Sequence, residues 1–541
     1  MATVPRKASK KSKPKARRVS RAVPASRATT VPRMRPAPPA HSAMDGDLPT
    51  LRVRMYRQGL GDCILLTFHP GADEKHVLID CGTLGSKYTD VKLPDVVAEI
   101  DKTTCGHLHL VVATHQHQDH LSGFSKLGSV FGAAKKQVDH VWLAWTEDPK
   151  DPDAKKLTKA RDGMAIAVKA AIQAMQAVNK DSETAKAMES LLGFFGNNSV
   201  VPAASGGADG ATFAAAARDS MDIARGLAKK PAYLSPGSPP LEPDWLPGFR
   251  FYVLGPPRDI NAIHDTGTHG SSELYALTAF GSAALQLAAK NRKKEDERND
   301  VEAIDPPFDK RFRLQRNDPR IKEALSFTYF AEMQKWRSID TDWLNAASSL
   351  AIKLDSFTNN TSLALAIERV ADGKVLLFPG DAQEGNWVSW HDPKNKWEVT
   401  RVDGEAATVT AKDLLARTVF YKVGHHSSHN ATAKAKGLEM MTNQSELTAF
   451  IPVDRQIALG RSPKGSWKMP ARQLYRRLLD QCDGRVVRSD LGWAADKQGD
   501  RTTESEFAGI GKDAEWARWT KSQAAANHVQ ITPTYIEFTL V

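Results

Sequence analysis

The sequence predicts a layered α/β fold, and three observations support this prediction. Short apolar segments typical of strands alternate with segments of helical spacing along much of the chain. The composition, 41% hydrophobic and 25% charged, is that of a globular protein. Clusters of His and Asp directly follow several of the apolar segments. A chain of 541 residues exceeds one ordinary core, so we expect two domains or one domain with large insertions.

The pattern in the first half of the chain predicts mainly strands, with one helix between them. Apolar or alternating segments bounded by glycine or polar residues predict strands within 51–58, 59–68, 75–82, 108–113, 136–145 and 249–259. Apolar residues at helical spacing predict a helix over 91–102.

The second half repeats the same alternation. We expect a hairpin within 359–387, strands within 417–431, 447–454 and 485–490, a helix over 469–482, and a last strand within 528–541. The core is therefore expected to come from separate parts of the chain, with insertions between them.

Changes in composition give the domain boundaries. We expect a disordered basic arm at 1–48. The first half of the core follows at 49–150, an Ala-rich helical insertion at 151–244 and a core strand at 245–260. A charged insertion at 261–354 precedes the second half of the core at 355–541.

The arm carries the excess positive charge. Residues 1–44 contain 12 Lys and Arg and no acidic residue, so the remaining 62 basic and 63 acidic side chains nearly cancel, although the whole chain has a formal charge of +11. Such an arm attracts nucleic acid or another polyanion, or is simply a solvated tail; the sequence leaves both open.

Other features of the composition bear on location. No apolar run is long enough to span a membrane. The stretch after Arg17-Arg18 is broken by Arg and Pro, so it is not an export signal. The four cysteines are scattered and form no CxxC pair, which agrees with a reducing compartment. We therefore expect a cytoplasmic protein; no oligomeric state is indicated.

The densest functional signal is the segment Val111–Phe124, "VVATHQHQDHLSGF". His115, His117, Asp119 and His120 follow an apolar strand within a few residues. Neutral imidazole and carboxylate are the ligands that zinc and similar divalent metals prefer. We interpret the segment as a metal-binding turn, in which the first two histidines can share one ion and the last two residues can face a second.

Further polar groups end other strands. Asp381 follows "KVLLFPG" and can bridge two ions with its two oxygens, and His425-His426 follows "FYKVG". One of these two histidines is expected to bind metal and the other to face substrate. Asp80 ends another strand, and we favour a hydrogen-bonding role for it over direct ligation. Because ligands converge at strand ends in α/β sheets, these groups predict one site.

The full set resembles the metallo-β-lactamase superfamily, with an Asp ending an early strand, then H-x-H-x-D-H, "GD" and a late His. It is still more similar to the hydrolase domain of the competence protein ComEC. The segments that carry this likeness are Gly59–Asp62, Leu78–Gly82, Val253–Pro256, Asn359–Leu363, "LLFPGDA", "KVGHHSS" and "LYRRLLDQCDGRVVRSDLG". The resemblance implies a metallo-β-lactamase-like αββα sandwich with large helical insertions, and it covers about 51–145, 245–260 and 355–495.

The chain departs from the superfamily pattern in three ways. A further His is missing, and Asn360 and Ser362 occupy its place, as in the ComEC-like branch. His140 and His269 are possible substitutes, but a packed role is expected for His140 within its strand. A late "HP" is Met469-Pro470 here, and membrane helices are absent.

The resemblance implies a hydrolase with two divalent metal ions, zinc or manganese, held by His115, His117, Asp119, His120, Asp381, His425 and His426. Such ions lower the pKa of a bound water and generate hydroxide near neutral pH. Asp119 and His426 are the expected catalytic residues. Ser427, Ser428 and His429 are placed to bind phosphate oxygens, although a plain polar loop is the alternative.

Three functions compete at this point. A phosphodiesterase or nuclease agrees with the ComEC-like branch and the cationic arm. An amide or ester hydrolase of lactamase type is disfavoured by the missing His. A noncatalytic interaction protein with a vestigial site is disfavoured by the intact ligand set.

Overall fold

The computed structural model describes residues 48–71, 73–87, 89–132, 136–178, 182–195, 215–264, 319–326, 328, 350–460, 467, 469–493 and 509–540. The expected basic arm lies outside these residues up to position 47, as do His269 and most of the expected charged insertion at 261–354.

The first sheet contains eight strands in the order β16-β17-β1-β2-β3-β4-β5-β6. Their bounds are β1 (Thr50–Tyr56), β2 (Cys63–His69), β3 (Lys75–Cys81), β4 (His107–Ala113), β5 (Gln137–Ala144), β6 (Ala232–Leu234), β16 (Val529–Ile531) and β17 (Tyr535–Leu540). Strands β3 to β6 are parallel, and the other neighbours are antiparallel. The parallel strands therefore place their C-terminal ends at one edge.

The second sheet contains seven strands in the order β15-β14-β13-β12-β9-β8-β7. Their bounds are β7 (Phe249–Gly255), β8 (Ala364–Arg369), β9 (Lys374–Phe378), β12 (Thr418–Lys422), β13 (Thr448–Ile451), β14 (Val486–Arg488) and β15 (Gly492–Trp493). Strands β9, β12, β13 and β14 are parallel.

The helices cover the sheets and fill the connections between strands. Their bounds are α1 (Leu93–Thr103), α2 (Gln118–Leu121), α3 (Phe124–Phe131), α4 (Pro152–Val178), α5 (Glu183–Leu192), α6 (Ala215–Gly226), α7 (Ile260–His264), α9 (Pro319–Ala324), α11 (Glu384–Ser389), α12 (Ala411–Ala416), α13 (Arg455–Gly460), α14 (Arg472–Gln481) and α16 (Asp513–Ala524). Residues 350–359 are also helical. Pro94 and Asp95 in the first turn of α1 favour its start, and Val96, Val97 and Ile100 form its buried face.

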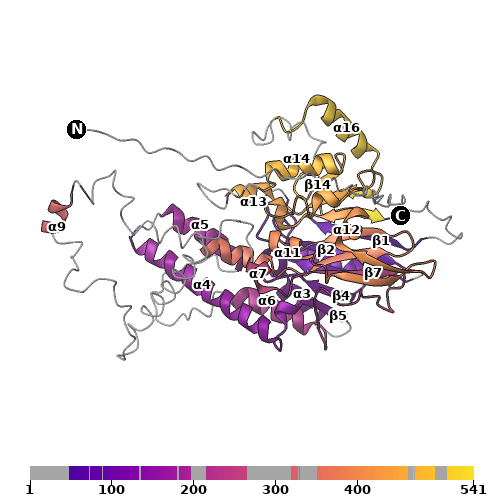
Figure 1. The fold of residues 1–541 in the computed structure, drawn as a ribbon, viewed down its shortest axis with the longest axis horizontal. Helices are drawn as coiled ribbons and strands as arrows, with labels where there is room; N and C mark the ends of the chain where they lie inside the picture. The colour runs from indigo at the N-terminus through magenta and orange to yellow at the C-terminus, as the bar shows by residue number, and fades with distance from the viewer. Residues whose placement is uncertain are drawn as a thin grey trace, which may run out of the picture. The chain divides into compact units, whose positions relative to one another are not determined.

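The two sheets pack face to face between helices (Figure 1). Trp142 of the first sheet contacts Phe251 of the second at a ring-centroid distance of 5.1 Å, and Phe538 of the first contacts Phe420 of the second at 5.0 Å. This apolar layer is what joins the two halves of the chain, because each sheet would otherwise expose one hydrophobic face.

Two further apolar layers lie outside the sheets. Residues of α1, α3 and α6 cover the first sheet, whereas residues of α11, α12, α14 and α16 cover the second. Buried tryptophans are concentrated over the second sheet, including Trp387, Trp390 and Trp519. The resulting architecture is an αββα sandwich, as the sequence predicted.

The expected strands and the long helices are present, with some differences. Strand β6 pairs with β5, and α6 packs on the first sheet, although both lie in the segment expected to be an insertion (151–244). An Ala-rich segment does not show by composition alone that it covers a core sheet. The last expected strand is a hairpin, β16 and β17, and the hairpin of β10 (Lys396–Thr400) and β11 (Ala406–Thr410) was not expected.

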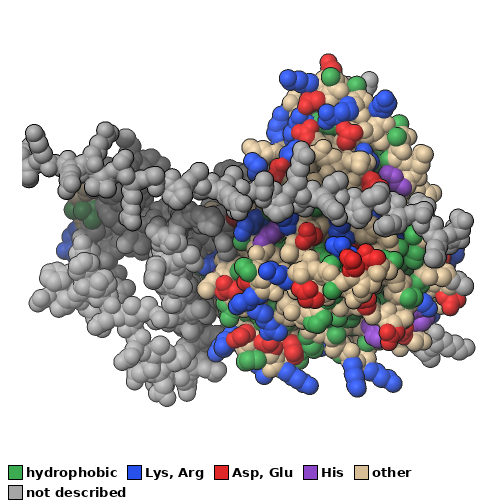
Figure 2. Space-filling model, turned by 45° about the vertical axis from the view of Figure 1, so that its right-hand side comes forward, with side chains coloured by type: hydrophobic (Ala, Val, Ile, Leu, Met, Phe, Trp, Pro, Cys, Tyr) green, Lys and Arg blue, Asp and Glu red, His purple; other side chains and the backbone are tan. Residues whose placement is uncertain are grey.

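Helices α4 and α5 form an apolar cluster of their own with residues 350–354 of the helix at 350–359. Within the described residues, no helix combines the length and the apolarity that a membrane span requires. On the face shown in Figure 2, acidic and basic side chains are interspersed, in agreement with the near balance of charge outside the arm.

Candidate metal centre

The candidate site lies where four parallel strands end. Asp80 ends β3, the His-rich turn follows β4, Asp381 follows β9, and His425 and His426 follow β12. The first two strands belong to one sheet and the last two to the other. The site is therefore built across the two sheets, from side chains that are distant in sequence.

Two glycines allow the chain to pass directly under the His-rich turn. The Asp62 backbone N–H donates to the Asp119 carbonyl at 2.8 Å. A Cβ added to Gly61, whose φ is +153°, would lie 2.5 Å from that carbonyl oxygen, and one added to Gly82 would lie 2.4 Å from it. Both distances are shorter than real Cβ contacts, so the Gly59–Asp62 and Leu78–Gly82 motifs supply the close approach that fixes the turn.

Four fully buried side chains converge at the centre of the site. Asp119, His120, Asp381 and His426 each offer a ligand atom within 4.8 Å of the others. The His426 Nε2 atom lies 2.8 Å from Asp119 Oδ2, and His120 Nε2 lies 3.1 Å from Asp381 Oδ2. The first sheet contributes two of these groups and the second sheet the other two.

His115 and His117 form a second pair beside this group. The His115 Nε2 atom lies 3.1 Å from His117 Nδ1, and both rings are buried. Two imidazole nitrogens at this separation can bind one ion at about 2.0–2.1 Å each. Asp381 of the central group acts on both rings electrostatically and raises their pKa values against the effect of burial.

Outer hydrogen bonds orient three of the histidines in the same way. His115 Nδ1 lies 3.0 Å from Thr114 Oγ1, His120 Nδ1 lies 2.7 Å from Asp80 Oδ2, and His426 Nδ1 lies 2.5 Å from the Pro452 carbonyl. Because each Nδ1–H has an oxygen to accept it, each ring presents its Nε2 lone pair to the site. Asp80 Oδ2 lies at the Nδ1 atom of His120, and its hydrogen-bonding role in place of direct ligation stays a prediction.

The turn after β12 is held in an unusual backbone conformation. His425, His426 and Ser427 have φ values of 42°, 51° and 64°, and form a short turn from Gly424. The His425 N–H donates to Asp381 Oδ1 at 2.7 Å, and the Ala471 N–H donates to the Ser427 carbonyl at 2.7 Å. This conformation directs the His426 ring to the centre.

The charges of the site are strongly coupled. Burial opposes protonation of His120, but Asp381, followed by Asp62 and Asp119, outweighs it and raises the His120 pKa well above its ordinary value. Burial also opposes ionisation of Asp381, yet His120 and Lys422 hold its pKa well below the usual range. The carboxylates therefore require positive partners.

His115 and His117, the second pair, and His425 have lowered rather than raised pKa values. Burial lowers the pKa of His115 well below the ordinary value and lowers that of His117 to about 3. Burial likewise lowers the pKa of His425 to about 4. These rings are neutral at pH 7, which is the form that binds a metal.

Sequence reasoning missed three buried ionisable residues at the site. Lys422 contacts the carboxylates of Asp62 and Asp381, and its pKa is raised by them against the effect of burial. A polar residue closing an apolar strand was the available signal for Lys422, and the Gly59–Asp62 motif was the signal for Asp62. Asp355, in the helix at 350–359, lies 4.0 Å from His117, and burial raises its pKa to about 8. No sequence signal distinguished it.

Other expected site residues have mainly positioning contacts. Ser362 Oγ accepts the Asp381 N–H at 3.1 Å, and Asn360 Oδ1 accepts the backbone N–H groups of Gln383 and Asn386. Ser428 Oγ lies 2.8 Å from His425 Nδ1.

The remaining expected residues differ in burial and in distance from the site. Ser427 is buried beside the candidate ligands, whereas His429 is exposed. His140 is exposed on β5, where its ring stacks on Trp245, so it is not near enough to replace the missing His.

The unsatisfied atoms of the site show that the residues fit a metal. Within the described part of the chain, buried polar atoms without a hydrogen-bond partner include Asp119 Oδ1, His120 Nε2 and Asp381 Oδ2. Buried polar groups are normally paired, so a concentration of such atoms in one turn region indicates a ligand. Imidazole and carboxylate donors of this number suit a divalent cation.

A second group of possible ligands, His107, His109 and Asp139, lies at the start of β4 and on β5. Here the partners are already present: His109 Nδ1 accepts the His76 N–H at 3.2 Å, and His107 Nε2 lies 2.8 Å from Asp139. We assign no metal to this group.

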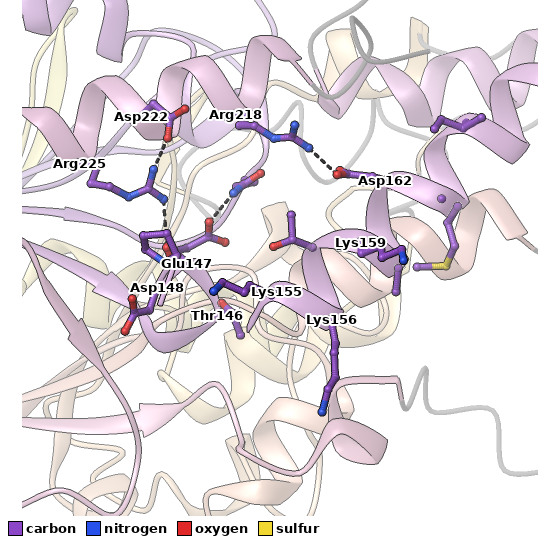
Figure 3. Close-up of a pocket in the computed structure, with 17 residues that line it drawn as sticks. Thr146, Glu147, Asp148, Lys155, Lys156, Lys159, Asp162, Arg218, Asp222 and Arg225 are labelled. Carbon is purple, nitrogen blue, oxygen red and sulfur yellow. Dashed lines mark hydrogen bonds and ion pairs between the residues drawn. The ribbon is translucent and has the colours of Figure 1, made fainter. Parts of the chain in front are cut away.

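A cavity of about 980 Å³ adjoins the His-rich turn (Figure 3). Gln116, between His115 and His117, lines it, together with residues of α4 and α6 such as Lys155, Lys159 and Arg218. In Figure 3, Arg218 and Arg225 turn toward Asp162 and Asp222, while Lys155, Lys156 and Lys159 come from one helix. None of the candidate ligands lines the cavity.

Comparison with models of known protein families gives a match. The model of the metallo-beta-lactamase superfamily matches residues 56–278, a range that includes the His-rich turn and ends before Asp381. No curated protein matches the chain. Members of this superfamily are usually hydrolytic metalloenzymes, and the match together with the αββα layers confirms the expected fold class.

Proposed function

We propose that this chain, with its match to the metallo-β-lactamase superfamily, is a metal-dependent phosphodiesterase or nuclease of ComEC-like type. The observation that carries the proposal is the convergence of Asp119, His120, Asp381 and His426, all fully buried, from two sheets. The same segments that resemble the ComEC-like branch build this centre, including Gly59–Asp62 under the turn.

The proposed ligands divide into two sets. His115 Nε2 and His117 Nδ1 form one set, and Asp119, His120 and His426 form the other; we propose that Asp381, which lies with the second set, bridges the two ions. Two divalent ions, zinc or manganese, are the cofactors that this donor set would hold. When bound, such ions lower the pKa of a water ligand and polarise a phosphoryl oxygen.

Protein side chains support this chemistry in definite ways. Lys422 and the His425 N–H both contact Asp381 Oδ1, which leaves Asp381 Oδ2 free to face the centre. Asp119 and His426, whose Oδ2 and Nε2 atoms lie 2.8 Å apart, are the proposed catalytic residues. Asp119 Oδ1, which is buried without a partner among the described residues, is the atom that would hold or move a proton. Ser427 lies next to them, with a buried hydroxyl that has no partner among the described residues.

A small excess of positive charge near the turn supports the phosphodiester substrate. The cavity beside Gln116 is lined by five basic and four acidic residues, namely Lys155, Lys156, Lys159, Arg218 and Arg225 against Glu147, Asp148, Asp162 and Asp222. The basic arm, with 12 Lys and Arg in residues 1–44, supplies further attraction for a polyanion. We propose nucleic acid as the partner of the arm, and access control as the role of the two insertions.

The four cysteines bear on location. All four are free thiols, and only Cys105 is exposed. Free thiols of this kind agree with a reducing compartment, so we propose a cytoplasmic location.

Metal analysis combined with a substrate panel tests the function. The full chain, freed of metal and reloaded with Zn²⁺ or Mn²⁺, is assayed on bis-p-nitrophenyl phosphate, DNA, RNA and nitrocefin. We expect metal-dependent hydrolysis of the phosphodiesters and none of nitrocefin. Asp119→Asn should reduce turnover by at least about 100-fold, the usual contribution of a general acid–base group.

The matched control is His140→Asn, at an exposed histidine that stacks on Trp245 away from the centre. It should keep full activity. Hydrolysis of nitrocefin alone would favour a lactamase-type enzyme, and metal binding without any turnover would favour a vestigial site. Activity that survives in Asp119→Asn would overturn the catalytic assignment.

A further inference from the structure

His117 is the exception among the histidines of the centre. His115, His120 and His426 each turn Nε2 to the site and have an oxygen next to Nδ1. His117 is reversed, because its Nδ1 atom faces His115 Nε2 at 3.1 Å. Its Nε2 atom therefore points away from the paired nitrogens, and it is buried without a hydrogen-bond partner among the described residues.

Among the described residues, a carboxylate lies near this nitrogen. The rings of Phe194 and Phe195 pack on His117 with centroid distances of 5.4 and 4.7 Å and offer no carboxylate or carbonyl in those contacts. The Asp355 Oδ1 atom lies 4.0 Å from His117 Nε2, and it too is buried without a partner in the described part of the chain. The separation exceeds a hydrogen bond by about 1 Å.

Asp355 is held in place by its own helix. Asn359 Nδ2 donates to Asp355 Oδ2 at 3.1 Å, which leaves Oδ1 on the side of His117. Leu354 packs in the cluster of α4 and α5, and Phe357 packs with Trp145, so both neighbours anchor the helix. The carboxylate therefore cannot turn to solvent without disturbing two apolar clusters.

We propose that Asp355 is the positioning residue of His117: its carboxylate accepts the Nε2–H bond and so fixes the ring with Nδ1 toward the metal. Ligating histidines commonly donate their other ring N–H to a carboxylate, which selects the tautomer and raises the basicity of the ligand atom. Asp355 would thereby strengthen the half of the centre that lacks a third histidine. The inference rests on the proposed function, since it concerns the metal held by His115 and His117.

The test measures metal binding by the full chain. Isothermal titration of the metal-free protein with Zn²⁺ gives the affinity and number of ions for the wild type, Asp355→Ala and Asp355→Asn. We expect Asp355→Ala to bind one of two ions about 10–100-fold more weakly, the usual effect of losing such a partner. Asp355→Asn should recover part of the loss, because its amide oxygen can still accept the N–H.

Thr358→Val is the matched control on the same helix. Thr358 is buried, and its hydroxyl donates to the Leu354 carbonyl one turn earlier, not to the centre. This variant should bind Zn²⁺ as the wild type does. Wild-type affinity in Asp355→Ala, or an equal loss in Thr358→Val, would overturn the proposal.

A measurement on the unaltered protein covers the case in which variants fail to fold. Histidine ¹⁵N resonances of the Zn²⁺-loaded chain report which ring nitrogen of His117 carries hydrogen. We expect it on Nε2; hydrogen on Nδ1 would overturn the proposal. If the wild type binds no metal, the proposed function itself fails, whereas normal binding with unaffected Asp355 variants removes only the present inference.

Discussion

At the residue scale, the turn Gly424–Ser428 combines function with backbone strain. His425, His426 and Ser427 all have positive φ, a region that costs a side-chain-bearing residue about 1–2 kcal/mol. The turn persists because Asp381 accepts the His425 N–H and Pro452 accepts the His426 ring N–H. The ligand contacts and the strain are therefore properties of the same short segment.

Replacing Ser427 by Gly should raise the free energy of unfolding by about 1 kcal/mol. Glycine removes the penalty at φ 64° and the buried hydroxyl without a partner, and these gains exceed the roughly 0.5–1 kcal/mol of chain entropy that glycine costs. Urea unfolding of the metal-free chain measures the change. Ser428→Gly is the control: its φ of −65° is ordinary, so this substitution should destabilise. Equal effects at both positions would contradict the strain argument.

The site residues differ in how far their place at the site could be predicted from the sequence. The His-rich turn and Asp381 could be predicted because a polar cluster after an apolar strand is unusual. Asn360 and Ser362 could be found by motif, but their contacts with backbone N–H groups required the structure. Asp355 could not be found, because its place beside His117 depends on how a helix from another part of the chain packs.

At the scale of elements, a short 3-10 helix, η2 (Gly193–Phe195), closes the site. Phe194 stacks on Trp467 with a centroid distance of 4.6 Å, and Phe195 contacts the His117 ring edge-on. Both phenylalanines are buried. Phe194 and Phe195 belong to the apolar cluster of α4 and α5, so the segment after α5 connects this cluster to the candidate metal centre.

Replacing Phe195 by Leu should speed the removal of metal by a chelator. The smaller side chain leaves a gap over His117, and the chelator or water reaches the ligands more easily. The rate of Zn²⁺ loss to excess chelator, followed by a fluorescent indicator, gives the result. Phe131→Leu, in the buried face of α3, controls for lost packing and should leave the rate unchanged. A similar acceleration in both variants would point to general loosening instead.

Elements were predictable where local pattern and final burial agree. Strand β4 is apolar from Leu110 to Ala113, and these residues are all buried, so its sequence and its environment match there. The segment containing α6 and β6 shows the limit. Its Ala-rich composition suits a helix in an insertion as well as a helix on a sheet, and only the pairing of β6 with β5 decides between them.

At the scale of the whole molecule, the two sheets also meet near the C-terminal hairpin. His528 Nε2 lies 3.1 Å from the Thr448 hydroxyl at the start of β13, while the His528 carbonyl accepts the Thr539 N–H of β17. Burial lowers the pKa of His528, as does Arg485, with Glu446 opposing and Lys374 adding to the effect. The neutral ring therefore links the second sheet to the first.

Stability should fall as the pH drops below about 6.5, the ordinary histidine pKa. Above that pH, His528 is neutral in both the folded and the unfolded chain. Below it, the unfolded chain takes up the proton first, because the folded pKa is lower, and unfolding is favoured. Urea unfolding at pH 7 and pH 5 should show a smaller loss for His528→Gln than for the wild type, since glutamine keeps an acceptor without titrating. An identical loss would contradict the role of His528.

The position of β17 between β16 and β1 determines when the first sheet can be completed during synthesis. Arg54 on β1 and Glu537 on β17 form a buried ion pair although they are 483 residues apart. At roughly 5–20 residues per second, a ribosome needs about 25–100 s to make the chain between them. Until β17 is made, the edge of β1 that pairs with β17 stays without a partner, and such an edge can pair with another molecule. A holding chaperone would protect this edge until β17 leaves the ribosome, so the yield of native protein depends on how long the open edge is shielded.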